Sequence, residues 1–198
     1  MVGARISARL GREEGQTVIE MITTMAMLSF VMAAVAALFV SGLHAQTDMD
    51  QRFQAQQNAR LALTAIRSDI RRSCMAPQVY ATPASGTTLA SGVFGAKVVL
   101  ASVCSSGVAT SNVTWCADSS TGAAPFGLYR QTGTACAFNN GVKRADQLKA
   151  NAVFALSTTS GQRPSLTVSF PVDANLSTTV GTYTLGDTVM ARNSAVTP

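Results

Sequence analysis

Titratable side chains are scarce in this chain, and their scarcity bears on catalysis. Only 13% of the 198 residues are charged, aromatic residues make up 6%, and the single histidine is His44. General acid–base and nucleophilic catalysis need several titratable groups that converge on one place. The acids in the second half of the chain are dispersed instead: Asp118, Asp146, Asp173 and Asp187. No glycine-rich phosphate loop and no G-x-S-x-G elbow is present. The sequence therefore predicts no enzyme, no catalytic residue and no cofactor.

Close cysteine pairs and clusters of basic residues are lacking as well. None of the cysteines forms a C-x-x-C pair, so we predict no zinc or other metal site. The formal net charge is +5, but the basic residues are scattered, at most in pairs such as Arg71-Arg72 and Lys143-Arg144. No stretch is typical of a nucleic-acid-binding tail, and a nucleic-acid partner is therefore not indicated.

What the chain does have is one long apolar run, from Val18 to Val40. As a helix this run would rise roughly 34 Å, enough to cross a hydrocarbon core of about 30 Å. The basic residues before it, Arg5, Arg9 and Arg12, favour a cytoplasmic N-terminus. We therefore expect a single-pass cell-membrane protein whose residues after the span face out of the cytoplasm.

Glu20 is the one ionisable residue inside this apolar run. An unpaired charge in hydrocarbon costs several kcal/mol, so an intramembrane acid is a functional hypothesis by default. Two simpler interpretations leave Glu20 unexplained. A secretory signal peptide cleaved near Leu43-His44-Ala45 would have an apolar core of about 7–15 residues, which is shorter than this run. A plain membrane anchor explains the length of the run but not its acid.

A third interpretation is a resemblance. The segment Gly15-Gln16-Thr17-Val18-Ile19-Glu20-Met21 resembles the cleavage and methylation motif of type IV prepilins and type II secretion pseudopilins. The resemblance implies that a prepilin peptidase cuts after Gly15 and methylates the new N-terminus at Gln16. It also implies that Glu20 serves in assembly. Gln16 departs from the phenylalanine most common at that position. Residues 1–15 would then be a leader peptide, and residues 16–43 the transmembrane and assembly helix.

The assembly role that the resemblance implies for Glu20 has a chemical rationale. The new α-amino group of Gln16 would be a cation close to the membrane, and Glu20 of a neighbouring subunit could pair with it. Two charges that are costly alone become one satisfied pair only on assembly, in a contact that repeats along a fibre. The partners implied are the prepilin peptidase, other pilin or pseudopilin subunits and an inner-membrane assembly platform.

Residues 44–74 form a second helical pattern. Ala59, Leu63, Ile66 and Ile70 follow a spacing of i, i+4, i+7 and i+11, which is one stripe of an amphipathic helix, and Cys74 extends it by one turn. No breaker separates this stretch from the span, so one continuous helix is expected, with Gly42 as the only hint of a flexible point. Part of this stretch also resembles the matching segment of minor pilins of the W or J type, namely QQNARLALTAIRSDIRRS.

Residues 75–198 are expected to form an extracytoplasmic β-rich domain. Pro77, Pro83 and Gly86 close the helix and start a loop. The predicted strands are 97–103, 112–117, 127–131, 165–170 and 182–190. Residues 146–154 could be a short helix or an edge segment. The predicted fold class is α+β: a long N-terminal helix, membrane-spanning in its first half, packed on a small antiparallel sheet in a pilin-like arrangement.

The four cysteines, Cys74, Cys104, Cys116 and Cys136, all follow the apolar run. An even number on one side of a membrane span indicates disulfides in an oxidising space. Sequence allows three pairings. We favour Cys74 with Cys104 and Cys116 with Cys136, and a single bridge between Cys104 and Cys116 stays open. Trp115 and Tyr129 could stack on a sugar, but a core position is the commoner fate of aromatic residues on a sheet.

The function predicted from the sequence is therefore structural: a minor pilin or pseudopilin assembled into a type IV pilus or a type II secretion pseudopilus. Its outer domain would be extracytoplasmic, or part of an extracellular pilus. The alternatives are a membrane-anchored or pilus-tip binding module, for adhesion or DNA uptake, and a secreted β domain with a conventional signal peptide.

Overall fold

The computed structural model describes residues 17–84, 86–136, 138, 140–173 and 182–194. The predicted leader 1–15 and the predicted cleavage residues Gly15 and Gln16 lie outside these described residues. The chain divides into two compact units, Met1–Gln46 and Thr47–Pro198. Helix α1 (Val18–Arg72) contributes residues to both units, and the described strands belong to the second one.

In the first unit, α1 begins directly after Thr17, whose carbonyl accepts the backbone N–H of Glu20 at 2.9 Å. The helix then continues through Gly42 without a break, as expected for one continuous helix. A Cβ at position 42 would meet nothing within 4 Å, so nothing packs against this glycine. Among the described residues, α1 is one helix that is long and apolar enough to cross a membrane.

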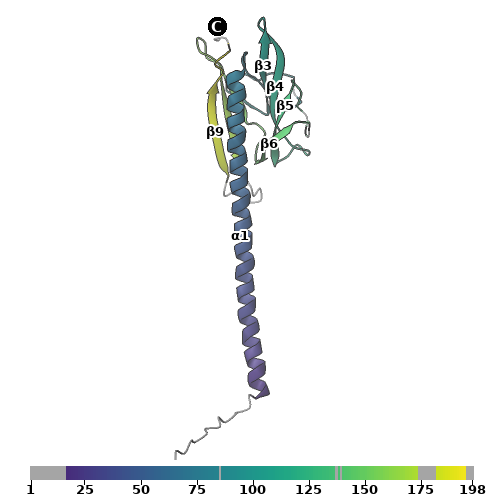
Figure 1. The fold of residues 1–198 in the computed structure, drawn as a ribbon, viewed down its shortest axis with the longest axis vertical. Helices are drawn as coiled ribbons and strands as arrows, with labels where there is room; N and C mark the ends of the chain where they lie inside the picture. The colour runs from purple at the N-terminus through teal and green to yellow at the C-terminus, as the bar shows by residue number, and fades with distance from the viewer. Residues whose placement is uncertain (1–16, 85, 137, 139, 174–181, 195–198) are drawn as a thin grey trace, which may run out of the picture. The chain divides into compact units, whose positions relative to one another are not determined.

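In the second unit, the remaining part of α1 lies against the sheet, between β9 on one side and β3 to β6 on the other (Figure 1). The buried helix residues recur every three or four positions: Ala55, Ala59, Ala62, Leu63, Ile66 and Ile70. This is the predicted stripe, because 3.6 residues per turn bring those positions onto one face. The helix ends at Arg72, so the prediction that it reaches Cys74 is wrong.

The described strands form one antiparallel sheet in the order β1-β3-β4-β5-β6-β8-β7-β2, with β9 paired to β8. Their bounds are β1 (Gln78–Tyr80), β2 (Phe94–Gly95), β3 (Lys97–Ser105), β4 (Val108–Asp118), β5 (Phe126–Thr132), β6 (Val142–Leu148), β7 (Phe154–Ser157), β8 (Ser165–Val172) and β9 (Tyr183–Met190). The coarse prediction is confirmed: the chain is α+β, with a long apolar helix and an antiparallel β domain.

All five predicted strands are present, as β3, β4, β5, β8 and β9, each within two residues of its predicted start except β4. Along β8, buried and half-buried residues alternate as expected for a strand with one face toward the core. The undecided segment 146–154 is not a helix. It contains the end of β6, a short connection and the first residue of β7.

Candidate functional site

The apolar part of α1 is the first candidate site. None of the residues in its most apolar stretch is buried within the chain, and the ring of Phe30 is 83% exposed. A contiguous apolar surface of this size is costly in water, because burial of apolar surface is the main favourable term in folding. The length and composition of this segment fit a helix whose surface is covered by lipid or by another protein.

Glu20 is exposed on this apolar surface. The other polar side chains between residues 18 and 40 all bond to the helix backbone. Thr23 donates to the carbonyl of Glu20 at 2.9 Å, Thr24 to that of Met21 at 3.0 Å and Ser29 to that of Met25 at 2.8 Å. Within the described part of this segment, the carboxylate of Glu20 is the polar side chain that has no partner. A partner for this carboxylate would have to come from another molecule or from outside that part.

A second set of residues attaches α1 to the sheet. One carboxylate oxygen of Asp69 accepts the indole N–H of Trp115 at 2.9 Å and the Nε–H of Arg130 at 2.8 Å. The other oxygen accepts an Nη2–H of Arg130 at 3.2 Å, so the guanidinium is bound in two places. The hydrogen bond to Asp69 raises the pKa of Arg130. This network joins the helix to β4 and β5, and Arg67 pairs with Asp187 to join it to β9.

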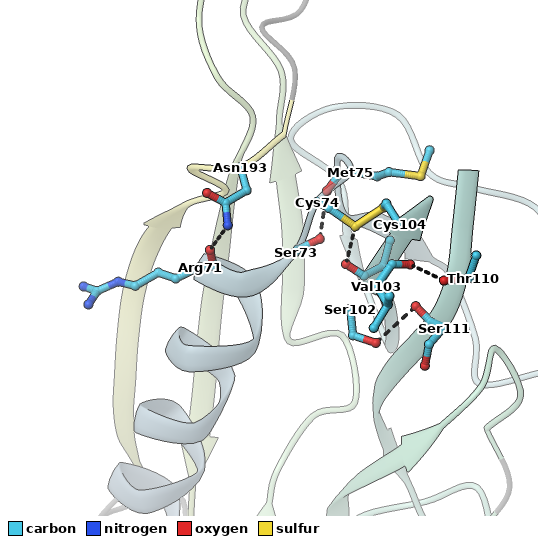
Figure 2. Close-up of a disulfide and its surroundings, with 11 residues drawn as sticks. Arg71, Ser73, Cys74, Met75, Ser102, Val103, Cys104, Thr110, Ser111 and Asn193 are labelled. Atoms are coloured by element: carbon cyan, nitrogen blue, oxygen red, sulfur yellow. Dashed lines mark hydrogen bonds between the residues drawn. A yellow bond between two sulfur atoms is a disulfide. The ribbon is translucent and has the colours of Figure 1, made fainter. Parts of the chain in front are cut away.

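The end of α1 is held by three contacts (Figure 2). The side-chain amide of Asn193 donates to the carbonyl of Arg71 at 3.1 Å, which satisfies one of the unpaired carbonyls of the last turn. The N–H of Cys74 then donates to the carbonyl of Ala101 at 3.0 Å. The disulfide Cys74–Cys104, with Cα atoms 6.2 Å apart, ties the chain to β3. The helix stops before Cys74 because the chain turns here toward that strand.

A second disulfide, Cys116–Cys136, joins β4 to the segment after β5, with Cα atoms 6.3 Å apart. These two bridges are the pairings that we favoured from the sequence. The alternative bridge between Cys104 and Cys116 is absent, since each of those residues is paired elsewhere. Disulfides of this kind fit an oxidising, extracytoplasmic compartment.

Trp115 and Tyr129 are not available as a sugar-stacking patch, because both side chains are buried. Phe138 makes an edge contact with Tyr129, the ring centroids lying 5.7 Å apart. Among the described residues, no group of three His, Cys, Asp or Glu side chains is placed to hold a metal ion.

Two features of the structure are not evident from the sequence. One is the role of Asp69, because a single aspartate within a helical pattern gives no sign of a contact with distant strands. The other is Lys97, which is buried over the ring of Tyr80, 4.4 Å from its centroid, and whose pKa is lowered by that burial. The sequence indicates the burial of Lys97 only by placing a lysine inside a predicted strand.

Comparison with protein-family models, with curated proteins and with solved structures found no match to this chain. The sequence and structure themselves describe an α+β protein with a helix long and apolar enough to cross a membrane. The chain combines a helix with a membrane-length apolar segment, a lone carboxylate in that segment, and an antiparallel domain with two disulfides.

Proposed function

We propose that this chain is a structural subunit of the type IV prepilin or type II secretion pseudopilin kind, in the role of a minor subunit. A prepilin peptidase removes residues 1–15, and the processed chain remains in the membrane until it is assembled. An inner-membrane assembly platform then adds it to a pilus or pseudopilus. Two observations support this proposal: a long N-terminal apolar helix in a chain with an antiparallel β domain, and the resemblance of Gly15 to Met21 to the prepilin motif.

The observation that carries the proposal is the unpartnered carboxylate of Glu20 on an exposed apolar helix. Membrane anchoring alone does not require this carboxylate, because a charged group within the membrane costs free energy. In an assembly of processed subunits, the α-amino group of Gln16 in a neighbouring subunit offsets that cost by pairing with Glu20. The exposed apolar side chains then pack against those of other subunits instead of lipid.

The first test is the intact mass and N-terminal sequence of the chain recovered from membranes of its native host. The proposal expects a chain that begins at methylated Gln16. A chain that begins near Gln46 would instead indicate a conventional signal peptide. A chain that begins at Met1 would indicate an unprocessed anchor. Either of these two results would overturn the proposal.

The second test separates the role of Glu20 from simple anchoring. Glu20→Ala should leave cleavage intact but reduce incorporation into fibres on the order of 100-fold, because the neighbour's α-amino group loses its partner. Ser29→Ala is the matched control, since its hydroxyl is already bonded to the carbonyl of Met25 within the same helix. Fibre fractions would be compared by immunoblot. Normal incorporation of Glu20→Ala would refute the pairing.

A further inference from the structure

The free edge of β9 differs from the other exposed edges of the described sheet. β9 is eight residues long and pairs with β8 in an uninterrupted register from Tyr183 to Met190, and none of the described strands lies on its other side. An edge strand of this length presents a row of unpaired backbone groups that can pair with another chain. Proline, lysine and β-bulges commonly protect such edges, and β9 has none of these.

The remaining edges are short or irregular. The sheet ends at β1 and β2, which have three and two residues. β3 extends past β1, but its register with β4 is irregular near Val103. The carbonyl of Ala101 on β3 already accepts the N–H of Cys74. β6 carries Lys143 and Arg144, and its register with β5 is also irregular. Within the described sheet, β9 is therefore the edge best suited to accept a further strand.

The backbone groups that face outward on β9 can be assigned. The N–H of Ala191 donates to the carbonyl of Pro164, at the position that continues the β8–β9 ladder. Hydrogen-bonded and non-hydrogen-bonded positions alternate along an antiparallel strand. Gly186, Thr188 and Met190 therefore present their N–H and C=O groups to the free edge. The N–H of Ser169, opposite Gly186, agrees with this assignment, because it donates to Val153 and not to β9.

A groove of about 390 Å³ runs beside this edge, between α1 and the last residues of β9. Three arginines line it: Arg67, Arg71 and Arg192. Asp187 neutralises Arg67, but Arg71 and Arg192 have no ion-pair partner among the described residues. Figure 2 shows the Arg71 side chain extending away from the disulfide, on the side of α1 where β9 lies. The groove therefore has an excess of positive charge directly beside unpaired backbone groups.

We propose that the β9 edge and this groove form a docking site for an extended, acidic segment of a partner protein. The segment adds as a strand to Gly186, Thr188 and Met190. Side chains of a strand alternate between its two faces, so acidic residues at every second position would face Arg71 and Arg192. The positions between them would lie beside Met190, which is 62% exposed. The ligand class is thus a strand that alternates acidic and apolar residues.

The same features disfavour nucleic acid as the occupant. No aromatic side chain is among the described residues that line the groove, so a stacking platform for bases is missing there. The proposed site lies on the β domain and involves neither the N-terminal cleavage nor Glu20. The docking proposal can therefore be tested independently of the proposed function.

The test uses the full chain in neutral detergent micelles and a fluorescein-labelled octapeptide that alternates glutamate with valine. Fluorescence anisotropy should detect binding of this peptide, and no binding of a counterpart with lysine in place of glutamate. Arg71→Glu with Arg192→Glu should weaken binding by about tenfold or more. The matched control is Arg144→Glu with Arg163→Glu, which makes the same charge change at exposed positions outside the groove. This control should bind as the unaltered chain does.

A second variant distinguishes strand addition from charge attraction alone. Thr188→Pro removes an outward N–H and leaves the ladder to β8 in place, whereas Thr188→Val keeps that N–H. Strand addition predicts loss of binding for Thr188→Pro only, and slower amide hydrogen exchange across residues 186–190 when the peptide binds. No binding of the glutamate peptide at millimolar concentration would overturn the proposal. So would binding that Thr188→Pro leaves intact, or an oligo-dT 20-mer that binds in place of the peptide.

Discussion

Asp69 joins three elements through one carboxylate, and only 14% of its side-chain surface is exposed. Its two oxygens accept hydrogen bonds from Trp115 on β4 and from Arg130 on β5. Bidentate pairs with arginine are among the stronger polar contacts in proteins, and removal of one partner leaves a desolvated cation behind. Asp69 therefore provides the polar attachment of the helix to β4 and β5, beside the pair of Arg67 with Asp187 on β9.

We predict that Asp69→Ala destabilises the β domain by about 3 kcal/mol, because it leaves both Arg130 and the Trp115 indole without their acceptor. The control is Asp146→Ala, which removes the exposed pair with Lys143 and should cost about 0.5 kcal/mol or less. Urea unfolding in detergent, followed by the fluorescence of the single tryptophan, gives both values. Equal losses for the two variants would show that the Asp69 network is not a major attachment.

Lys97 predicts a dependence of stability on pH. Burial lowers the pKa of Lys97 from its usual 10.5, so the charged form is less favourable in the folded chain than in the unfolded one. This cost is fully present below the folded pKa and disappears as the pH rises toward 10.5. The variant Lys97→Met should be more stable than the unaltered chain near neutral pH, and its advantage should shrink as the pH approaches 10.5. Thermal unfolding across that range measures the difference, and an advantage that is constant with pH would contradict the prediction.

At the scale of the element, α1 uses two kinds of surface in one helix. Its apolar segment is exposed on all sides, and its later turns bury one stripe against the sheet. The early part of that stripe is made of alanine, at Ala55, Ala59 and Ala62, and the later part of leucine and isoleucine. Small side chains let the helix backbone approach the strands closely, since no Cγ atoms separate them.

We predict that Ala59→Leu costs about 1–3 kcal/mol, because a fully buried alanine in a packed interior leaves no room for extra carbon atoms. Gln57→Leu is the control, an exposed position of the same helix that should change stability by about 0.5 kcal/mol or less. The free energy of unfolding in urea checks both. An Ala59→Leu variant as stable as the control would show that the helix–sheet contact is loosely packed at this turn.

The sequence pattern anticipated most of these elements. The stripe through Ala59, Leu63, Ile66 and Ile70 and the alternation along β8 were both visible, because the periods of 3.6 and 2 follow directly from backbone geometry. Strands β1, β2, β6 and β7 were not predicted. β1, β2 and β7 have too few residues to show a period, and they form because longer strands offer them partners. β6 has seven residues, but its buried and exposed residues do not alternate, so it shows no period of two.

At the scale of the whole molecule, the chain divides after Gln46. The unit that begins at Thr47 contains both disulfides and a core that joins the helix stripe to the sheet, including Trp115, Phe154 and Phe170. A unit with its own core has the main requirement for folding alone. The apolar segment contributes nothing to that core, since it is not buried within the chain.

We predict that a truncated chain of residues 47–198 folds without detergent and unfolds within a few degrees of the full chain in micelles. The reason is that none of the described core residues lies in the apolar segment, so the truncation costs only fraying at the new helix end. Size-exclusion chromatography and circular dichroism, with both disulfides verified by mass, check this outcome. A truncated chain that aggregates or lacks a cooperative transition would show that the apolar segment supports the domain.

The sequence by itself determined the membrane-length helix, the isolated position of Glu20, the amphipathic stripe and the central strands. These depend on local periodicity, on segment length and on the cost of a charge in hydrocarbon, all of which can be judged from neighbours in the chain. Tertiary structure alone decided which cysteines pair, how Asp69 meets Arg130, and that β9 ends beside Arg71 with a free edge. Those features join residues far apart in the chain, so their energies exist only once the fold has brought the partners together.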